Sequence, residues 1–295
     1  MLEALSPHLE TIVAADGVEL VTELHEPVGE PRGVCVLSHA MMASRRSLDR
    51  PRGRGLCSAL VRAGHRVLLC DLRGHGDARP RASEGARWSY DDLVRYDAPA
   101  LVRRAREIAR GGRVVIVGHS LFGHVAIAAC GLGLLDHVDA IAAIGANVWE
   151  RSAEPSRLTF AAKRAGLELF AAIAGRLGHF PARALRIGSD DEPAPYWLQF
   201  RRWAREGRYD SLDRRDDYAA AVGRVRAPVL AVCSEGDRVL CPPHLADAYV
   251  RRVARHELFV MRGRDAPGHM ELACSTRGEP AWSAIVDFFA RVAPR

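Results

Sequence analysis

Lysine is almost missing from this chain, because Lys163 is the only lysine in 295 residues that hold 42 Lys and Arg together. The net charge of +6 therefore comes from arginine. The arginines are scattered, with no basic block of the kind that follows phosphates, so we expect no nucleic-acid partner. Hydrophobic residues make up 48% of the chain, enough for a sizeable core in one large domain or two small ones.

Paired cysteines are also lacking. The chain has seven cysteines, an odd number, and no Cys-x-x-Cys spacing. This excludes a disulfide framework and a zinc site, and it fits a reducing cytoplasm. Cys35, Cys70 and Cys233 lie in apolar runs, where a thiol behaves as a small hydrophobic group. We expect neither a metal nor a cofactor.

Signals for export and membrane insertion are missing as well. The segment Met1 to Glu10 has no basic start and no apolar stretch, so no secretory signal is expected. The run from Val114 to Leu135 has no acidic or basic residue, but it contains histidines, a serine and glycines, and its first half has strand character. A buried strand, turn and helix explain this run better than a membrane span does.

The remaining pattern alternates between strands and helices. An N-terminal hairpin is expected around Asp16-Gly17. Apolar runs predict strands at 33–38, 66–70, 114–118, 140–144, 228–233 and 257–261, and helical spacing predicts helices at 55–64, 98–109 and 281–292. This order predicts an α/β fold with a mostly parallel, doubly wound sheet.

The alternation breaks between about Trp149 and Val222, where the chain becomes helical and aromatic. We interpret 149–222 as a helical cap inserted between two parts of the core, 1–148 and 223–295. The cap is expected over the carboxyl edge of the sheet, where ligands bind in such folds. Its aromatic rings either line an acyl pocket or form the core of a helical lid.

One segment carries most of the functional signal. The strand 114–118 ends in Gly-x-Ser, with Ser120 at the apex, and a helix-forming run follows at 124–130. This order is typical of a nucleophile elbow, which exposes a serine hydroxyl above a sheet. The usual pattern ends in glycine two residues after the serine, but here Phe122 holds that position and Gly123 follows it.

A serine nucleophile needs a base and an acid that orients the base. On this architecture the expected order is Ser, then Asp or Glu, then His. Asp237 follows the strand 229–233, and His269 follows the strand 258–261, so both lie at carboxyl ends of strands after the elbow. We therefore predict His269 as the base and Asp237 as its partner. The reserve acids are Glu235 and Glu150.

An oxyanion site needs two N–H donors. We predict the backbone of Leu121, after the nucleophile, and of Met41, in the loop after the strand 33–38. Ala40 stands in that loop where the resemblance described below implies glycine, and Met41 and Met42 could simply cover the core. The loop 71–77 follows another strand end and is interpreted as structural, with no chemistry assigned to His75.

With these residues placed, the chain resembles the α/β-hydrolase superfamily over essentially its whole length. The motifs that carry the resemblance are Ser38-His39-Ala40, Asp71-x-Arg73-Gly74-x-Gly76, Gly118-His119-Ser120, Gly236-Asp237 and Gly268-His269. More narrowly, it looks like bacterial predicted hydrolases related to serine aminopeptidase-like and lysophospholipase-like enzymes, whose cap has counterparts to 178–183, Gly188 and 197–203.

The leading hypothesis is a cofactor-independent serine hydrolase that cleaves a small acyl ester or thioester, or less favourably an amide. We expect its substrate to contact His39, Phe122, Trp149 and Trp197. One alternative is acyl transfer or lyase-type biosynthetic chemistry on the same fold. The other is a ligand-binding protein that has lost catalysis, a reading that Phe122 in the elbow motivates.

Overall fold

The computed structural model describes residues 7–292, so the first six residues of the segment searched for a secretory signal lie outside it. Eight strands form one sheet in the order β1-β2-β4-β3-β5-β6-β9-β10. The strands are β1 (His8–Val13), β2 (Glu19–His25), β3 (Val34–Ser38), β4 (Arg66–Cys70), β5 (Val114–His119), β6 (Ala140–Ile144), β9 (Val229–Ser234) and β10 (His256–Met261). β2 pairs antiparallel with both β1 and β4. The six strands β4, β3, β5, β6, β9 and β10 are parallel, which confirms the predicted mostly parallel sheet.

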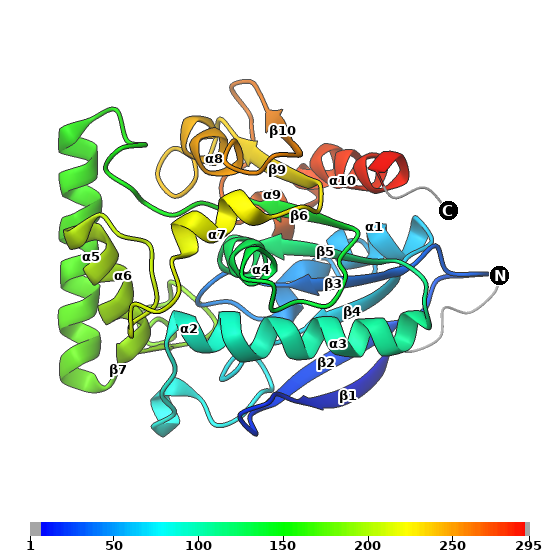
Figure 1. Cartoon of the computed structure of the whole chain (residues 1–295), viewed down its shortest axis with the longest axis horizontal. Coiled ribbons are helices and arrows are strands. Elements are labelled where there is room, and N and C mark those ends of the chain that lie inside the picture. The colour runs from blue at the N-terminus through cyan, green and yellow to red at the C-terminus, as the bar shows by residue number, and fades with distance from the viewer. Residues whose placement is uncertain (1–6, 293–295) are drawn as a thin grey trace.

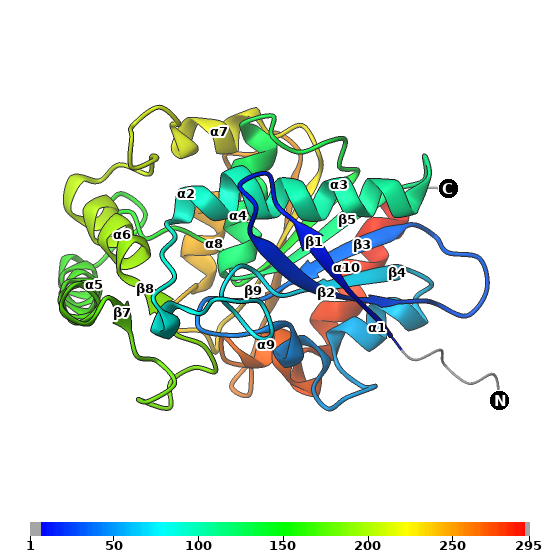
Figure 2. The same cartoon turned by 90° about the horizontal axis from the view of Figure 1, so that it is seen from below.

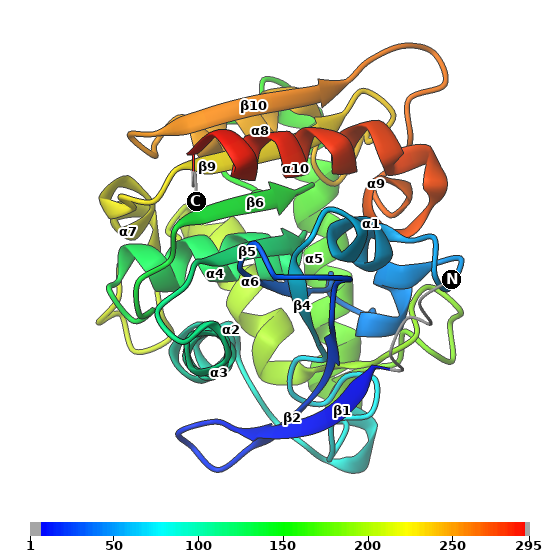
Figure 3. The same ribbon diagram turned by 90° about the vertical axis from the view of Figure 1, so that its right-hand side faces the viewer.

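Helices cover both faces of the sheet (Figure 3). One face packs against α1 (Leu56–Arg62), α9 (Glu271–Cys274) and α10 (Glu279–Val292), and the other against α2 (Tyr90–Asp92), α3 (Ala98–Ala109), α4 (Leu121–Gly131) and α8 (Pro243–Val250). Short 3₁₀ turns lie at Arg45–Asp49, Ala82–Glu84 and Thr276–Gly278, and a π-helical turn at Leu93–Asp97. Side chains along each strand point alternately to the two faces of the sheet and so enter two separate cores. In β5, Val115 and Val117 lie in the core with α1 and α10, and Val114 and Ile116 lie in the core with α3 and α4.

The segment between β6 and β9 holds the remaining elements. These are α5 (Arg157–Leu177), β7 (His179–Phe180), β8 (Glu192–Pro193), α6 (Ala194–Glu206) and α7 (Tyr218–Arg224). Figures 1 and 2 show α5 and α6 beyond one end of the sheet. We refer to residues 149–222 as the insertion.

Local chemistry sets the ends of the insertion's helices. The side chain of Ser156 accepts a hydrogen bond from the N–H of Thr159 and so caps the start of α5. Gly178 ends this helix in the left-handed conformation. α7 packs against α4 so closely that a Cβ on Gly131 would lie 1.9 Å from the carbonyl oxygen of Ala221. No helix within residues 7–292 combines the length and the apolar character that crossing a membrane requires.

Candidate active site

Ser120 occupies a strained turn between β5 and α4. Its backbone has φ 49° and ψ −106°, a conformation that residues other than glycine rarely adopt. The N–H of Ser120 donates a 2.7 Å hydrogen bond to the carbonyl of Ile144, the last residue of β6. The turn is thus fixed against the neighbouring strand, and the half-buried serine lies at the carboxyl end of the sheet.

Two glycines allow this turn to close. A Cβ on Gly118 would lie 2.4 Å from the nitrogen of Gly123, and a Cβ on Gly123 would lie 2.7 Å from the Cβ of Ala146. Gly123 therefore provides the close approach of strand and helix that the usual pattern assigns to the preceding position. Phe122 is fully buried in the core. It has no exposed surface in this structure, and its predicted contact with substrate stays a prediction.

Asp237 and His269 meet at the same edge. Asp237 follows β9, His269 lies between β10 and α9, and His269 Nδ1 donates a 2.5 Å hydrogen bond to Asp237 Oδ2. The N–H groups of Leu240 and Cys241 each donate a 3.0 Å hydrogen bond to the same carboxylate. Burial alone would raise the pKa of Asp237, but the hydrogen bond and charge of His269, together with these donors, hold it below its usual value. The carboxylate stays charged and fixes the ring.

The imidazole of His269 lies against Gly145. A Cβ on Gly145 would lie 3.0 Å from His269 Cε1, and Gly145 directly follows Ile144, whose carbonyl binds Ser120. The three predicted residues therefore lie at neighbouring strand ends. Within residues 7–292 no hydrogen bond joins the hydroxyl of Ser120 to His269.

His119 contacts the loop of His269, and sequence reasoning did not single it out. Its Nε2 donates a 3.2 Å hydrogen bond to the backbone carbonyl of His269, and the two rings lie 5.2 Å apart between centroids. Burial, and to a lesser extent the charge of His269, lowers the pKa of His119 to about 3. The ring is therefore neutral and carries its proton on Nε2. It stands at the variable position of the elbow motif, so the pattern gave no signal.

Trp149 braces the loop of Asp237. Its Nε1 and the side-chain amide of Asn147 donate hydrogen bonds of 2.9 and 3.0 Å to the carbonyl of Leu240, whose N–H binds Asp237. The half-buried ring also lies 5.1 Å from the ammonium of Lys163. Trp149 thus supports the acid, and its predicted contact with substrate stays a prediction.

His39 and Trp197, both predicted to contact substrate, are buried side chains. His39 is fully buried, its Nδ1 donates to the carbonyl of Ala40 at 2.8 Å, and its Nε2 accepts the N–H of Leu72 at 3.1 Å. Both ring nitrogens are engaged by the backbone, so the ring shapes two loops. Trp197 is 2% exposed and packs on two phenylalanine rings of the insertion, with centroid distances of 5.1 and 5.3 Å. Neither side chain is exposed in this structure, and both predicted contacts with substrate stay predictions.

The two predicted oxyanion donors lie on loops after adjacent strands. Leu121 is the first residue of α4, so its N–H has no acceptor within the helix. Met41 follows β3, which pairs with β5, and the next residue, Met42, has φ 55°. Adjacent parallel strands bring the loops at their carboxyl ends together.

The reserve acids point elsewhere. Glu235 accepts hydrogen bonds from Arg262 at 3.2 Å and from the N–H of Gly263 at 2.9 Å. Glu150 pairs with Arg252. Both carboxylates are therefore held by arginines away from the imidazole, and Asp237 is the acid that binds it.

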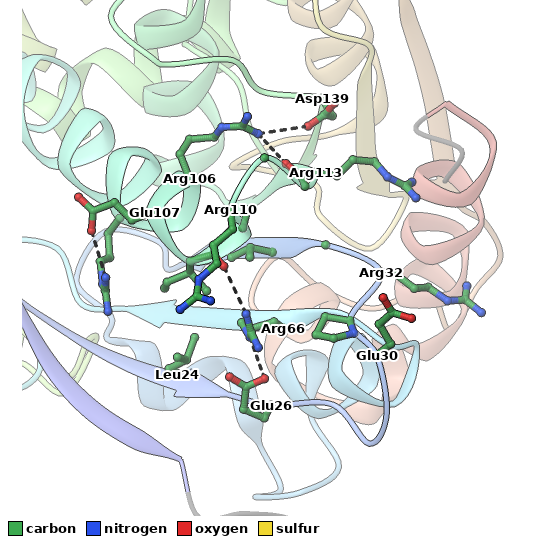
Figure 4. A pocket seen from close by; sticks show the side chains of 18 of the residues that line it. Leu24, Glu26, Glu30, Arg32, Arg66, Arg106, Glu107, Arg110, Arg113 and Asp139 are labelled. Carbon is green, nitrogen blue, oxygen red and sulfur yellow. Dashed lines mark hydrogen bonds and ion pairs between the residues drawn. The ribbon is translucent and has the colours of Figure 1, made fainter.

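A cavity of about 1020 Å³ lies at the opposite edge of the sheet, where β3, β4 and β5 begin (Figure 4). Its wall includes Arg66, which pairs with Glu26 at 2.7 Å, and Arg106, which approaches Asp139 at 4.0 Å. None of the three residues predicted for catalysis lines it. This cavity is therefore separate from the candidate active site. Within residues 7–292 no group of three or more His, Cys, Asp or Glu side chains is arranged to hold a metal.

Known proteins share this fold. A sequence model described as "Alpha/beta hydrolase family" matches residues 13–282. An esterase from Pyrococcus furiosus is similar in structure, with a TM-score of 0.65, 17% identity and coverage of 97% of this chain and 91% of that chain. Est1E from Butyrivibrio proteoclasticus has a TM-score of 0.64 and 18% identity, with coverage of 97% of this chain and 99% of that chain. An esterase from Exiguobacterium antarcticum has a TM-score of 0.61 and 17% identity, with coverage of 94% of this chain and 98% of that chain. No curated protein matches the chain.

Proposed function

Because the chain belongs to the alpha/beta hydrolase family, we propose that it is a serine hydrolase that cleaves a carboxylic ester or thioester through an acyl-enzyme on Ser120. The observation that carries this proposal is the short hydrogen bond between His269 and Asp237, with the imidazole against Gly145 beside the elbow. That the structural neighbours are esterases supports an ester substrate.

Acylation uses the groups at the elbow. Ser120 Oγ attacks the acyl carbon while His269 Nε2 takes its proton, and Asp237 stabilises the resulting imidazolium. The carbonyl oxygen becomes an oxyanion, which accepts hydrogen bonds from the N–H groups of Leu121 and Met41. The bond to the leaving alkoxide or thiolate then breaks, and that group receives the proton from His269. The hydrogen bond from nucleophile to base commonly tightens only in the substrate complex.

Deacylation repeats these roles with water as the nucleophile. His269 takes a proton from water as the water oxygen attacks the acyl carbon of the ester on Ser120. The second tetrahedral oxyanion uses the same two donors, and collapse returns the proton to Ser120 Oγ and releases the acid.

The position of Gly123 favours an active enzyme over a binding protein that has lost catalysis. That alternative depended on Phe122 crowding the turn, whereas Phe122 is buried in the core and Gly123 makes the close approach. Both observations support an active elbow.

The test combines covalent labelling with hydrolysis assays. A fluorophosphonate probe should label Ser120, and Ser120→Ala should lose the label and at least about 10³-fold in kcat. Ser152→Ala, which changes an exposed serine of the insertion, is the matched control and should behave as wild type. Hydrolysis that persists in folded Ser120→Ala would refute the mechanism.

The substrate class is tested with a panel of p-nitrophenyl esters and acyl thioesters, assayed with and without an added alcohol or amine. Free acid as the sole product supports hydrolysis. If the acyl group passes chiefly to the added acceptor, the acyl-transfer alternative replaces hydrolysis.

A further inference from the structure

The insertion contacts the predicted oxyanion loop through the backbone of Met42. The N–H of Met42 donates a 2.7 Å hydrogen bond to Glu192 Oε1. Its carbonyl accepts hydrogen bonds from the N–H groups of Ser189 at 2.8 Å and Asp190 at 3.3 Å. A Cβ on Gly188 would lie 2.5 Å from the same carbonyl oxygen. The residue directly after Met41 is thus held on both sides by one segment of the insertion.

Glu192 forms a fully buried ion pair with His75. Its side chain and that of His75 are both fully buried, and His75 Nε2 donates a 3.0 Å hydrogen bond to Glu192 Oε1. His75 Nδ1 donates to the carbonyl of Arg73 at 2.8 Å, so both ring nitrogens carry protons and the ring is charged. A buried ion pair contributes little net stability compared with an apolar pair of similar volume. The ion pair instead fixes the position of Glu192 Oε1, which also accepts the hydrogen bond from Met42.

A second contact ties the same segment to the loop after β4. Asp190 Oδ1 accepts a 2.9 Å hydrogen bond from the N–H of Gly76, and Asp190 is 2% exposed. Two carboxylates of the insertion therefore bind the loops after β3 and β4 together.

Met42 needs such support because its φ of 55° is unfavourable for a residue with a side chain. A residue in this region persists only where its surroundings hold it. The acceptor on Glu192 and the two donors from residues 189 and 190 supply that constraint.

We propose that Glu192 is a positioning residue for catalysis: by holding the N–H of Met42 it sets the direction of the preceding N–H, on Met41, toward the oxyanion. The inference rests on the proposed function and deepens it, because it makes docking of the insertion a condition for a complete oxyanion site. An oxyanion exists only in the transition state and the intermediates, so misplacing a donor lowers kcat and leaves KM nearly unchanged.

The test compares three variants with wild type. Glu192→Ala removes the acceptor and should lower kcat about 100-fold, near the loss expected when one oxyanion donor is removed, with KM within about threefold. Glu192→Gln keeps an acceptor for Met42 and should recover kcat to within about fivefold of wild type. Glu168→Gln, which neutralises a carboxylate on α5 that pairs with Arg205, is the control and should change neither parameter.

Inhibitor binding separates positioning from a merely structural role. A trifluoromethyl ketone forms an anionic adduct with the serine, whereas the matching secondary alcohol does not. Glu192→Ala should weaken the ketone about as much as it lowers kcat and leave the alcohol unchanged. Gly188→Ala, which pushes on the carbonyl of Met42, should act in the same direction if Glu192→Ala does not fold.

The outcomes distinguish this inference from the function beneath it. If the probe labels Ser120 but Glu192→Ala keeps its kcat, or changes only KM, the positioning role is wrong and the serine hydrolase stands. If Glu192→Gln loses as much kcat as Glu192→Ala, the ion pair rather than the acceptor matters, and the inference is also wrong. Failure of Ser120→Ala to lose activity overturns the function itself.

Discussion

His119 donates a hydrogen bond to the backbone carbonyl of His269, so the residue before the proposed nucleophile holds the loop of the proposed base. Replacing His119 with alanine removes this donor and leaves space beside a ring that it contacts. We expect kcat to fall about tenfold, because a looser imidazole spends less time in the reactive geometry. Steady-state kinetics checks this, and His119→Gln, which retains an N–H donor, should lose less. Equal losses in both variants would contradict a hydrogen-bonding role.

In the proposed mechanism Asp237 orients His269 through its hydrogen bond to Nδ1. Asp237→Asn keeps the shape but favours the wrong tautomer of His269, and kcat should fall about 10³- to 10⁴-fold. Glu235→Gln is the matched control in the same turn, since its carboxylate binds Arg262, and it should stay within about twofold of wild type. The comparison is made by single-turnover acylation of a p-nitrophenyl ester. A large loss in Glu235→Gln would move the acid's role to that residue.

Phe122 and Gly123 offer a test of the altered elbow. Restoring the usual pattern with Phe122→Gly should destabilise the protein by about 3–5 kcal/mol, because it empties a fully buried site. Gly123→Ala should cost about 1–3 kcal/mol and reduce activity, because its Cβ would lie 2.7 Å from the Cβ of Ala146. Urea unfolding measures both, with Leu169→Ala at an exposed position of α5 as the control. A more active Phe122→Gly would contradict this account.

Arg45 holds the loop 71–77 from inside the protein. Its buried guanidinium pairs with Asp71, which is fully buried, and with Asp77 at 2.8 Å. Arg45→Ala leaves Asp71 without its charge partner and should cost about 3–5 kcal/mol of unfolding free energy. Arg46→Ala removes an exposed partner of the same Asp77 and should cost less than about 1 kcal/mol. Similar losses in the two variants would show that burial does not govern the effect.

The pattern of apolar residues predicted the helices and strands well where an element is buried and where residues that break it stand at its ends. The predicted strands 66–70 and 140–144 and the predicted helix 98–109 agree with β4, β6 and α3 to the residue. The strands are apolar on both faces, and the helix is bounded by Pro99 near its start and glycines after its end. Ser120, Asp237 and His269 each follow a predicted parallel strand. The sequence therefore predicted that they lie at one edge of the sheet, because the carboxyl ends of parallel strands share that edge.

The failures concern contacts between distant segments. Spacing could not show which way Phe122 and Trp197 point, and both are buried. The pair β7 and β8 is only two residues long in each strand and has no periodicity to detect. Glu192 binds residues more than 100 positions earlier in the chain, so its role depends on how the insertion packs.

The pair of Glu192 and His75 also predicts how stability depends on pH. Burial alone would lower the pKa of His75, but the charge and hydrogen bond of Glu192 raise it to about 9, whereas an unfolded histidine titrates near 6.5. The stabilisation is therefore complete below about pH 6.5 and is lost as pH rises through about 9. Between these values the unfolding free energy should fall by about 1.4 kcal/mol for each pH unit through this group.

Urea unfolding of wild type and of Glu192→Gln at pH 7.0, 7.5 and 8.0 measures this slope as the difference between the two proteins, because the thiols and the other histidines titrate alike in both. Glu192→Gln removes the charge that raises the pKa of His75, so its unfolding free energy should fall less steeply with pH than that of wild type, by up to about 1.4 kcal/mol for each pH unit. Glu168→Gln should keep the wild-type slope, because its carboxylate has a lowered pKa and stays charged throughout. A wild-type slope in Glu192→Gln would mean that His75 is not the group that titrates, and that the buried ring is neutral at pH 7.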